Sequence, residues 1–224
     1  MKIRLNITTR IAGGFGSLIL LTIVAFFYTF IVLKDTRKKT DIVVEEVIPS
    51  LTELKDFNLL LQKSRTLISK WYYSRTITDQ YNDRVELQKL ITSNYSEKKN
   101  KLLSLAKNWK PEEKEKIETI LRRTETTFAL YQSEIMEKLK TLDDYKDSEK
   151  YFLAGQSLED AENALNNIAR NLNQLIETKT QEADNVKQSM FKSINFLENV
   201  VKILGLILLI GGIVIAFFTI RSII

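Results

Sequence analysis

Apolar residues recur along the middle of this sequence at alternating steps of three and four. One run contains Leu158, Ala161, Leu165, Ile168, Leu172 and Leu175, and a second contains Val47, Leu51, Leu54, Asn58, Leu61, Arg65, Ile68 and Tyr72. A third contains Ile117, Leu121, Thr124, Phe128, Tyr131 and Ile135, and a weaker one contains Ile91, Tyr95, Leu102, Leu105 and Trp109. This rhythm predicts four α-helices that each turn one narrow face toward neighbours crossing at a shallow angle.

Residues that interrupt helices are scarce in the same region. Between residues 34 and 202 the chain has one glycine, Gly155, and two prolines, Pro49 and Pro111. This leaves little room for strands and hairpins, and Pro111 suits the first turn of a helix. We interpret Gly155 as part of a turn and Ser157 as the N-cap of the last helix. The predicted helices cover residues 35–75, 79–108, 111–147 and 158–202.

Two long uncharged segments flank these helices. Residues 11–33 and 203–220 contain no charged side chain. At about 1.5 Å per residue they reach roughly 35 Å and 27 Å, which suits a hydrocarbon core about 30 Å thick. A cleaved signal peptide is the alternative for the first segment. Its 23 apolar residues exceed the usual apolar stretch of about 7–15 residues, however, and no small-residue cleavage site precedes Lys34.

The sequence thus predicts an all-α fold, an antiparallel up-down four-helix bundle with two flanking transmembrane helices. No acidic residue occurs before Asp35 or after Glu198, so both short ends carry only basic charges. The positive-inside rule places these ends in the cytoplasm and the bundle outside. The predicted domains are a cytoplasmic N-terminus (1–10), a first transmembrane helix (11–33), an extracytoplasmic bundle (34–202), a second transmembrane helix (203–220) and a cytoplasmic linker (221–224).

Composition narrows the function classes. The net charge is +5, but the segment between the spans holds 29 basic and 28 acidic residues, so the excess lies in the cytoplasmic ends. We therefore expect a lipid bilayer as partner and no nucleic acid. Cysteine and histidine are absent, which excludes disulfides, metal sites built on those residues and nucleophile–histidine pairs. We expect no cofactor, no metal and no catalytic activity in this chain.

Three short segments resemble known receptors. Residues 1–16 place basic residues ahead of a glycine-bearing span, residues 47–51 form a proline-bearing start of a long helix, and Arg221-Ser222-Ile223 follows the second span. Together with the two spans, these segments are similar to the sensor half of bacterial methyl-accepting chemotaxis receptors and sensor histidine kinases. The third segment resembles the entry to a HAMP signalling linker.

The resemblance implies a homodimeric receptor in the bacterial inner membrane. It would sense a small-molecule or periplasmic protein ligand and pass a displacement of its last helix, of order 1–2 Å, through the second span. The sequence stops four residues past this span, at Ile224. We therefore expect a HAMP linker and an output domain beyond it, which would be a methyl-accepting, kinase or phosphatase domain.

The candidate ligand-binding residues are polar or aromatic positions on the first predicted bundle helix. Arg65 occupies an apolar position of its run and could grip a carboxylate, although snorkelling at the bundle edge or an ion pair with a neighbouring glutamate is the alternative. Trp71, Tyr72, Tyr73 and Arg75 could line a small-molecule pocket or simply cap the end of the core. Pro49 predicts a kink or local break, and a hinge is the functional interpretation of it.

Other candidates concern packing. Within the spans, Ala12 with Gly16 and Gly212 with Ala216 place small residues four apart, which permits close helix approach. The polar positions Asn58 and Lys179 are expected to fix helix register or a dimer, or to be partly exposed.

Two rival functions remain open on the sequence. A structural membrane tether would use the bundle as a spacer or assembly surface and pass no signal. A membrane-anchored enzyme would need a catalytic domain beyond this segment, which would then act only as its regulator.

Overall fold

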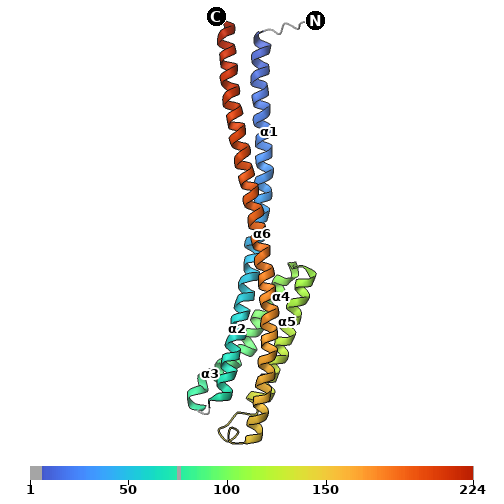
Figure 1. The fold of residues 1–224 in the computed structure, drawn as a ribbon, viewed down its shortest axis with the longest axis vertical. Helices are drawn as coiled ribbons and strands as arrows, with labels where there is room; N and C mark the ends of the chain where they lie inside the picture. The colour runs from blue at the N-terminus through green and yellow to red at the C-terminus, as the bar shows by residue number, and fades with distance from the viewer. Residues whose placement is uncertain (1–6, 75–76, 224) are drawn as a thin grey trace. The chain divides into compact units, whose positions relative to one another are not determined.

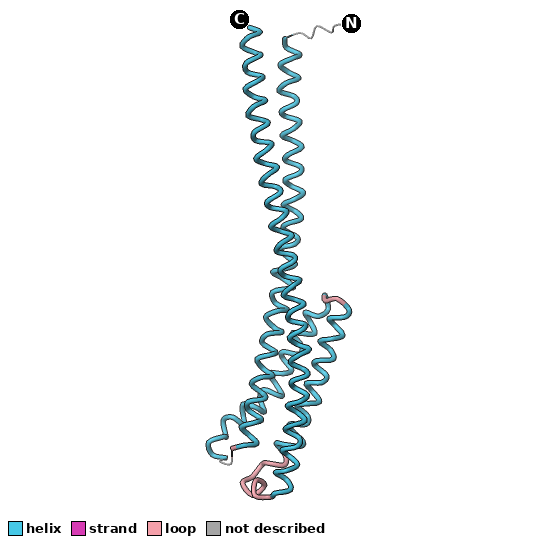
Figure 2. Tube along the Cα trace, in the orientation of Figure 1, coloured by secondary structure: helices cyan, strands magenta, loops and turns pink. Residues whose placement is uncertain are grey.

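The computed structural model describes residues 7–74 and 77–223, and these residues are helical apart from short turns, with no strand among them (Figures 1 and 2). The helices are α1 (Ile7–Ile42), α2 (Ile48–Tyr73), α3 (Ile77–Lys89), α4 (Tyr95–Leu105), α5 (Pro111–Leu130) and α6 (Ser148–Ile223). Wider π-helical segments η1 (Val43–Val47), η2 (Leu90–Asn94) and η4 (Tyr131–Met136) and a 3₁₀ turn η3 (Ala106–Asn108) join or extend them. The predicted all-α class is confirmed.

The chain divides into two compact units. The first contains Met1–Val43 and Asp184–Ile224, and the second contains Val44–Ala183. Helix α6 contributes to both units. The second unit is therefore shorter than the predicted domain 34–202. Residues 34–43 and 184–202 of that domain belong to the first unit, together with the apolar segments. We describe each unit by itself.

In the first unit, α1 packs against the C-terminal part of α6. Gly14 faces the Ile215 side chain, and the ring of Tyr28 lies 6.0 Å from that of Phe196. Because the partner number falls as the α1 number rises, the two helices are antiparallel. Two helices of the chain, one near each end, are long and apolar enough to cross a membrane.

The predicted small-residue contacts are wrong for this helix pair. A Cβ atom placed on Gly16 or Gly212 would meet nothing within 4 Å, and Ala12 and Ala216 are exposed. The close approaches occur instead at two other glycines. A Cβ atom built on Gly14 would lie 3.1 Å from the Ile215 side chain, and one built on Gly211 would lie 3.0 Å from the Leu18 side chain. The prediction was based on small residues spaced four apart in the sequence. The sides of α1 and α6 that face each other pass instead through Gly14 and Gly211.

The second unit has a continuous apolar core from α2, α3, α4, α5 and the first part of α6. The predicted runs on α5–η4 and α6 are buried at every position. On α2 the buried residues that repeat at steps of three and four are Leu54, Phe57, Leu61, Ser64, Ile68 and Trp71, and Ser50, Leu60, Leu67 and Tyr72 are buried as well. The run chosen from the sequence shares four of these, but Asn58 is only half-buried and Arg65 is exposed. The two polar members therefore lie at the edge of the buried face and not at its centre.

Contacts between the helices of this unit define their order. Asn58 on α2 donates a hydrogen bond to Asn173 on α6 at 3.2 Å. Lys98 on α4 reaches Asp56 on α2 at 2.8 Å. On α4 and α5, the Tyr95 hydroxyl donates to the Leu121 carbonyl at 2.9 Å. Helix α5 in turn contacts α6 through Glu113 and Lys179. Each of the four helices thus touches two neighbours.

The start of α6 differs from the prediction. Helix α6 begins at Ser148, and Gly155 lies inside it, so Ser157 is not an N-cap. The cap is Asp147, whose Oδ1 accepts hydrogen bonds from the backbone N–H groups of Glu149 and Lys150 at 3.1 and 3.2 Å. The third predicted helix also ends early, because residues 137–147 form a run of turns after η4.

The helix widens just before Pro49. Residues Val43–Val47 form a π-helical turn, and Pro49 then lies in the first turn of α2. A proline cannot donate the i→i−4 hydrogen bond and its ring crowds the preceding turn, so a widened turn accommodates it. The kink or local break and the hinge at Pro49 both remain predictions.

Candidate ligand pocket

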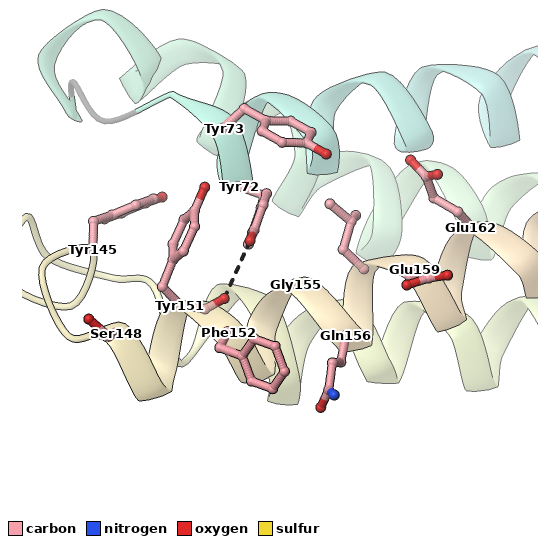
Figure 3. A pocket seen from close by; sticks show the side chains of 11 residues that line it. Tyr72, Tyr73, Tyr145, Ser148, Tyr151, Phe152, Gly155, Gln156, Glu159 and Glu162 are labelled. Carbon is pink, nitrogen blue, oxygen red and sulfur yellow. Dashed lines mark hydrogen bonds between the residues drawn. The ribbon is translucent and has the colours of Figure 1, made fainter.

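A hollow of about 740 Å³ lies in the second unit between the C-terminal end of α2 and the first turns of α6 (Figure 3). We call it the tyrosine pocket. It is lined by Tyr72, Tyr73, Tyr145, Ser148, Tyr151, Phe152, Gly155, Gln156, Leu158, Glu159 and Glu162. Five of these residues carry aromatic rings and two carry carboxylates, so the lining combines apolar faces with negative charge.

The floor of the pocket is a stacked pair of tyrosines. The rings of Tyr72 on α2 and Tyr151 on α6 lie 4.5 Å apart and are inclined by only 15°. The Tyr72 hydroxyl donates a hydrogen bond to the Tyr151 carbonyl oxygen at 3.4 Å (Figure 3). A Cβ atom on Gly155 would lie 2.6 Å from this hydroxyl oxygen. Glycine at position 155 therefore makes room for Tyr72 and does not end a helix.

The wall next to Tyr72 is held by the turn that precedes α6. The Tyr145 hydroxyl donates to the Trp71 carbonyl oxygen and accepts from Arg84 Nη2 at 3.0 Å. The Arg84 guanidinium also lies 4.2 Å from the centre of the Trp71 ring, and the indole N–H donates to the Leu139 carbonyl at 3.0 Å. Trp71 thus fixes the wall from behind and does not line the hollow.

Burial favours the neutral form of two tyrosines of this site, Tyr72 and Tyr145, by raising the pKa of each. It raises the pKa of Tyr72, and the hydrogen bond with Tyr151 adds to the effect. Burial also raises the pKa of Tyr145, although the nearby Arg84 guanidinium opposes it. A phenol ordinarily ionises near pH 10. At physiological pH these side chains therefore offer ring faces and hydroxyls to a ligand, and no phenolate.

The two carboxylates differ in their surroundings. Glu162 faces the Arg65 guanidinium across 3.5 Å, and Arg65 also donates to Asn166 Oδ1 at 3.0 Å. Glu159 is exposed one turn earlier on α6 and has no ion-pair partner within the described part of the chain. Arg65 therefore balances only one of the two negative charges.

The pocket contains two of the five candidate ligand-binding residues. Tyr72 and Tyr73 line it, Trp71 supports its wall, and Arg65 forms an ion pair with Glu162, which was one of the alternative interpretations. Arg75 lies outside the described residues. The sequence reasoning missed Tyr145, Tyr151, Phe152 and Glu159. The sequence feature that could have revealed them is the group of aromatic residues at 145–152, which is followed by Gly155. We had interpreted Gly155 as part of a turn.

A second polar site occupies the opposite end of the same unit. Lys179 Nζ lies 2.7 Å from Glu113 Oε2 and 2.9 Å from Glu182 Oε2. The side chains of Lys179 and Glu113 are each only 6% exposed, so this is a buried ion pair. Lys110 reaches Glu182 at 3.3 Å from the hairpin that joins α4 and α5. Lys179 therefore joins α5 to α6 within this unit.

Trp109 connects this ion pair to the start of α2. The Lys179 ammonium lies 5.0 Å from the centre of the Trp109 ring, and the indole N–H donates to Ser50 Oγ at 2.9 Å. Ser50 in turn donates to the Glu46 carbonyl in η1 at 2.6 Å. We call Ser50, Trp109, Lys110, Glu113, Lys179 and Glu182 the Lys179 cluster. Its groups are joined by ion pairs and hydrogen bonds, although Glu113 Oε1 is buried without a hydrogen-bond partner among the described residues.

Residues 7–74 and 77–223 contain no group of three or more acidic, histidine or cysteine side chains placed to hold a metal ion. Comparison with family models, with curated proteins and with solved structures finds no match for this chain. The function is therefore inferred from the two units and the pocket themselves.

Proposed function

We propose that this chain is the sensor module of a bacterial transmembrane receptor of the chemotaxis or two-component type. In this proposal the second unit is an antiparallel four-helix bundle outside the inner membrane, formed by α2, α3 with α4, α5 and the first part of α6. The apolar parts of α1 and α6 cross the bilayer, and both termini are cytoplasmic. The resemblance of residues 1–16, 47–51 and 221–223 to such receptors supports this assignment.

The observation that carries the proposal is the contrast in what the two units bury. The apolar windows of α1 and α6 are wholly unburied, and single side chains such as Phe26 are 70% and Leu20 65% exposed. Apolar surface of this extent is unstable in water but is the expected exterior of a helix in lipid. The second unit instead closes its own apolar core and exposes charges, which suits water.

Signal transmission is proposed to use α6. This helix is continuous from Ser148, at the tyrosine pocket, to Ile223 beyond the second apolar segment. Helical hydrogen bonding makes such an element stiff, so a shift of its first turns can be passed along its length. A second copy of the chain is the expected partner, as in a homodimeric receptor.

Cysteine labelling tests the topology. The chain has no cysteine, so one introduced thiol gives a clean signal. Ser104→Cys on α4 and Thr9→Cys on α1 both replace exposed residues. In intact bacterial cells a membrane-impermeant maleimide should label the first variant and leave the second unlabelled until the cells are permeabilised. Equal labelling of both variants in intact cells would refute the proposed topology.

Disulfide crosslinking tests transmission. Leu18 and Gly211 face each other in the first unit, with 3.0 Å between a Leu18 side-chain atom and a Cβ built on Gly211. The double variant Leu18→Cys with Gly211→Cys should crosslink, and the rate should change with conditions that change receptor output. Ile19→Cys with Leu209→Cys, at exposed positions, is the matched control. A rate that never changes would favour a structural tether.

A further inference from the structure

We propose that the tyrosine pocket binds a small organic cation of the substituted ammonium class. The inference deepens the proposed sensor function, on which its biological role rests, because it names the chemistry of the ligand. Its observations are the composition of the lining, the charges around it and the state of the adjacent helix end (Figure 3).

The lining presents aromatic faces at its opening. Tyr73 is 67% exposed and Phe152 is 62% exposed, so both rings keep open surface among the described residues, Tyr73 on α2 and Phe152 on the other side of α6 (Figure 3). Tyr72 and Tyr151 close the hollow as a stacked pair. The faces of aromatic rings carry partial negative charge and attract alkylated ammonium groups. An open aromatic hollow of this size is therefore suited to an organic cation.

The charged residues of the lining act in the same direction. Glu159 and Glu162 line the pocket, and no lysine or arginine does so among the described residues. Arg65 approaches Glu162 at 3.5 Å, which leaves the charge of Glu159 unbalanced within the described part of the chain. The described part of the lining thus carries a net negative charge, which attracts a cation and repels an anion.

The N-terminus of α6 does not reverse this preference. A helix N-terminus usually attracts anions through its free backbone N–H groups. Here the carboxylate of Asp147 already accepts hydrogen bonds from the N–H groups of Glu149 and Lys150. An anionic ligand would find the end of the helix occupied and would meet Glu159. Cation binding is therefore the favoured chemistry.

Titration calorimetry on the full chain in maltoside micelles tests this with choline as the probe. Its neutral isostere 3,3-dimethyl-1-butanol and the anion acetate are the comparison ligands. We expect choline to bind with a Kd of about 1 mM or tighter, and the isostere to bind at least about tenfold more weakly, since only the cation gains from the rings and Glu159.

Variants locate the site. Glu159→Gln and Tyr73→Leu should each weaken choline binding by about fivefold. The same substitution at an exposed glutamate further along α6, Glu177→Gln, is the matched control and should leave the affinity unchanged. Thermal melting of each variant should match the parent chain, which shows that weaker binding does not come from unfolding.

Three outcomes would overturn the inference. They are no heat from choline at concentrations where micelles stay intact, equal binding of the isostere, or acetate binding to the parent chain as tight as that of choline. Calorimetry needs no membrane topology and no output domain. A failure here would therefore leave the labelling and crosslinking results of the sensor proposal standing, and a failed topology test would not alter a measured choline affinity.

Discussion

The two ends of the second unit are built from different chemistry. At one end the Lys179 cluster buries an ion pair whose partners are 6% exposed, surrounded by an indole and a serine hydroxyl. At the other end the tyrosine pocket leaves a hollow of about 740 Å³ between aromatic rings and two carboxylates. Charged side chains are buried at the first end, whereas aromatic rings are partly exposed at the second.

This difference assigns the ends different roles. A buried ion pair is satisfied only in one geometry, so the Lys179 cluster fixes α2, α5 and α6 in register. Aromatic rings around a hollow can instead contact a ligand without first breaking a bond of the fold. We therefore expect the Lys179 cluster to stabilise the fold of the second unit and the tyrosine pocket to bind the ligand.

The largest effect is expected from Lys179→Met. The variant leaves the Glu113 carboxylate buried without its cation, and removal of one partner from such a pair typically costs about 3–5 kcal/mol. Urea unfolding in maltoside micelles, followed by tryptophan fluorescence, measures the loss. Both tryptophans of the chain lie in the second unit, so the signal reports on this unit.

Two controls make this result specific. Lys187→Met, at an exposed position of α6, should change the free energy of unfolding by no more than about 0.5 kcal/mol. The double variant Glu113→Leu with Lys179→Met removes both charges and should recover most of the stability. A Lys179→Met loss no larger than that of Lys187→Met would mean that the ion pair does not hold this end.

Gly155→Ala is expected to have the next largest effect. The new Cβ atom would lie 2.6 Å from the Tyr72 hydroxyl oxygen, so the stacked tyrosine pair must shift. Crowding of this kind costs about 1–3 kcal/mol, against a gain of about 1 kcal/mol from replacing glycine by alanine in a helix. We expect a net loss of up to about 2 kcal/mol and weaker choline binding.

The Tyr72→Ala background supplies the control for this prediction. Without the phenol ring, Gly155→Ala meets no obstacle and should stabilise the chain by about 1 kcal/mol. The sign of the substitution should therefore reverse between the two backgrounds in urea unfolding. The same sign in both would show that glycine at position 155 serves something other than the approach of Tyr72.

The helices could be predicted from the sequence because apolar periodicity is a local property. The runs on α5–η4 and α6 are buried throughout, as predicted. Periodicity alone did not fix which of two adjacent faces of α2 is central, since Phe57, Ser64 and Trp71 follow the same rhythm as Asn58, Arg65 and Tyr72. Only the neighbouring helices decide between them, and their positions are not encoded in the spacing.

The pocket was only partly predictable for a related reason. Tyr72 was recognised as an aromatic candidate, but its stacking partner Tyr151 lies 79 residues away on another helix. Gly155 was interpreted as a turn because a glycine in a helix interior is usually unfavourable. Glycine occurs at this helix position because a Cβ atom there would lie 2.6 Å from the hydroxyl oxygen of Tyr72. The carboxylate of Asp147 caps the helix, a role that the sequence reasoning gave to Ser157.

Ser50→Ala should have a smaller effect than either of these substitutions. It leaves the buried indole N–H of Trp109 without its acceptor at 2.9 Å and removes the hydrogen bond to the Glu46 carbonyl. The loss of one such partner costs about 1 kcal/mol in the free energy of unfolding. Thr52→Ala removes a comparable hydroxyl bond at an exposed position and should cost no more than about 0.5 kcal/mol.

The smallest effect is expected from Glu182→Gln, and it should depend on pH. Burial opposes ionisation of this carboxyl, but hydrogen bonds from Lys179 and then Lys110 lower its pKa below the usual value. Because its pKa is lower in the folded state, the carboxylate stabilises the fold above its unfolded pKa of about 4.3, and this contribution is lost as the pH falls through the folded pKa.

The parent chain should therefore exceed Glu182→Gln in stability by no more than about 1 kcal/mol near pH 7, the range of partly exposed ion pairs. This difference should shrink as the pH falls from about 5 to 3. Urea midpoints of both chains across this range measure it. A difference that grows on acidification would show that Glu182 is held protonated in the Lys179 cluster, and this end would then not be closed by paired charges.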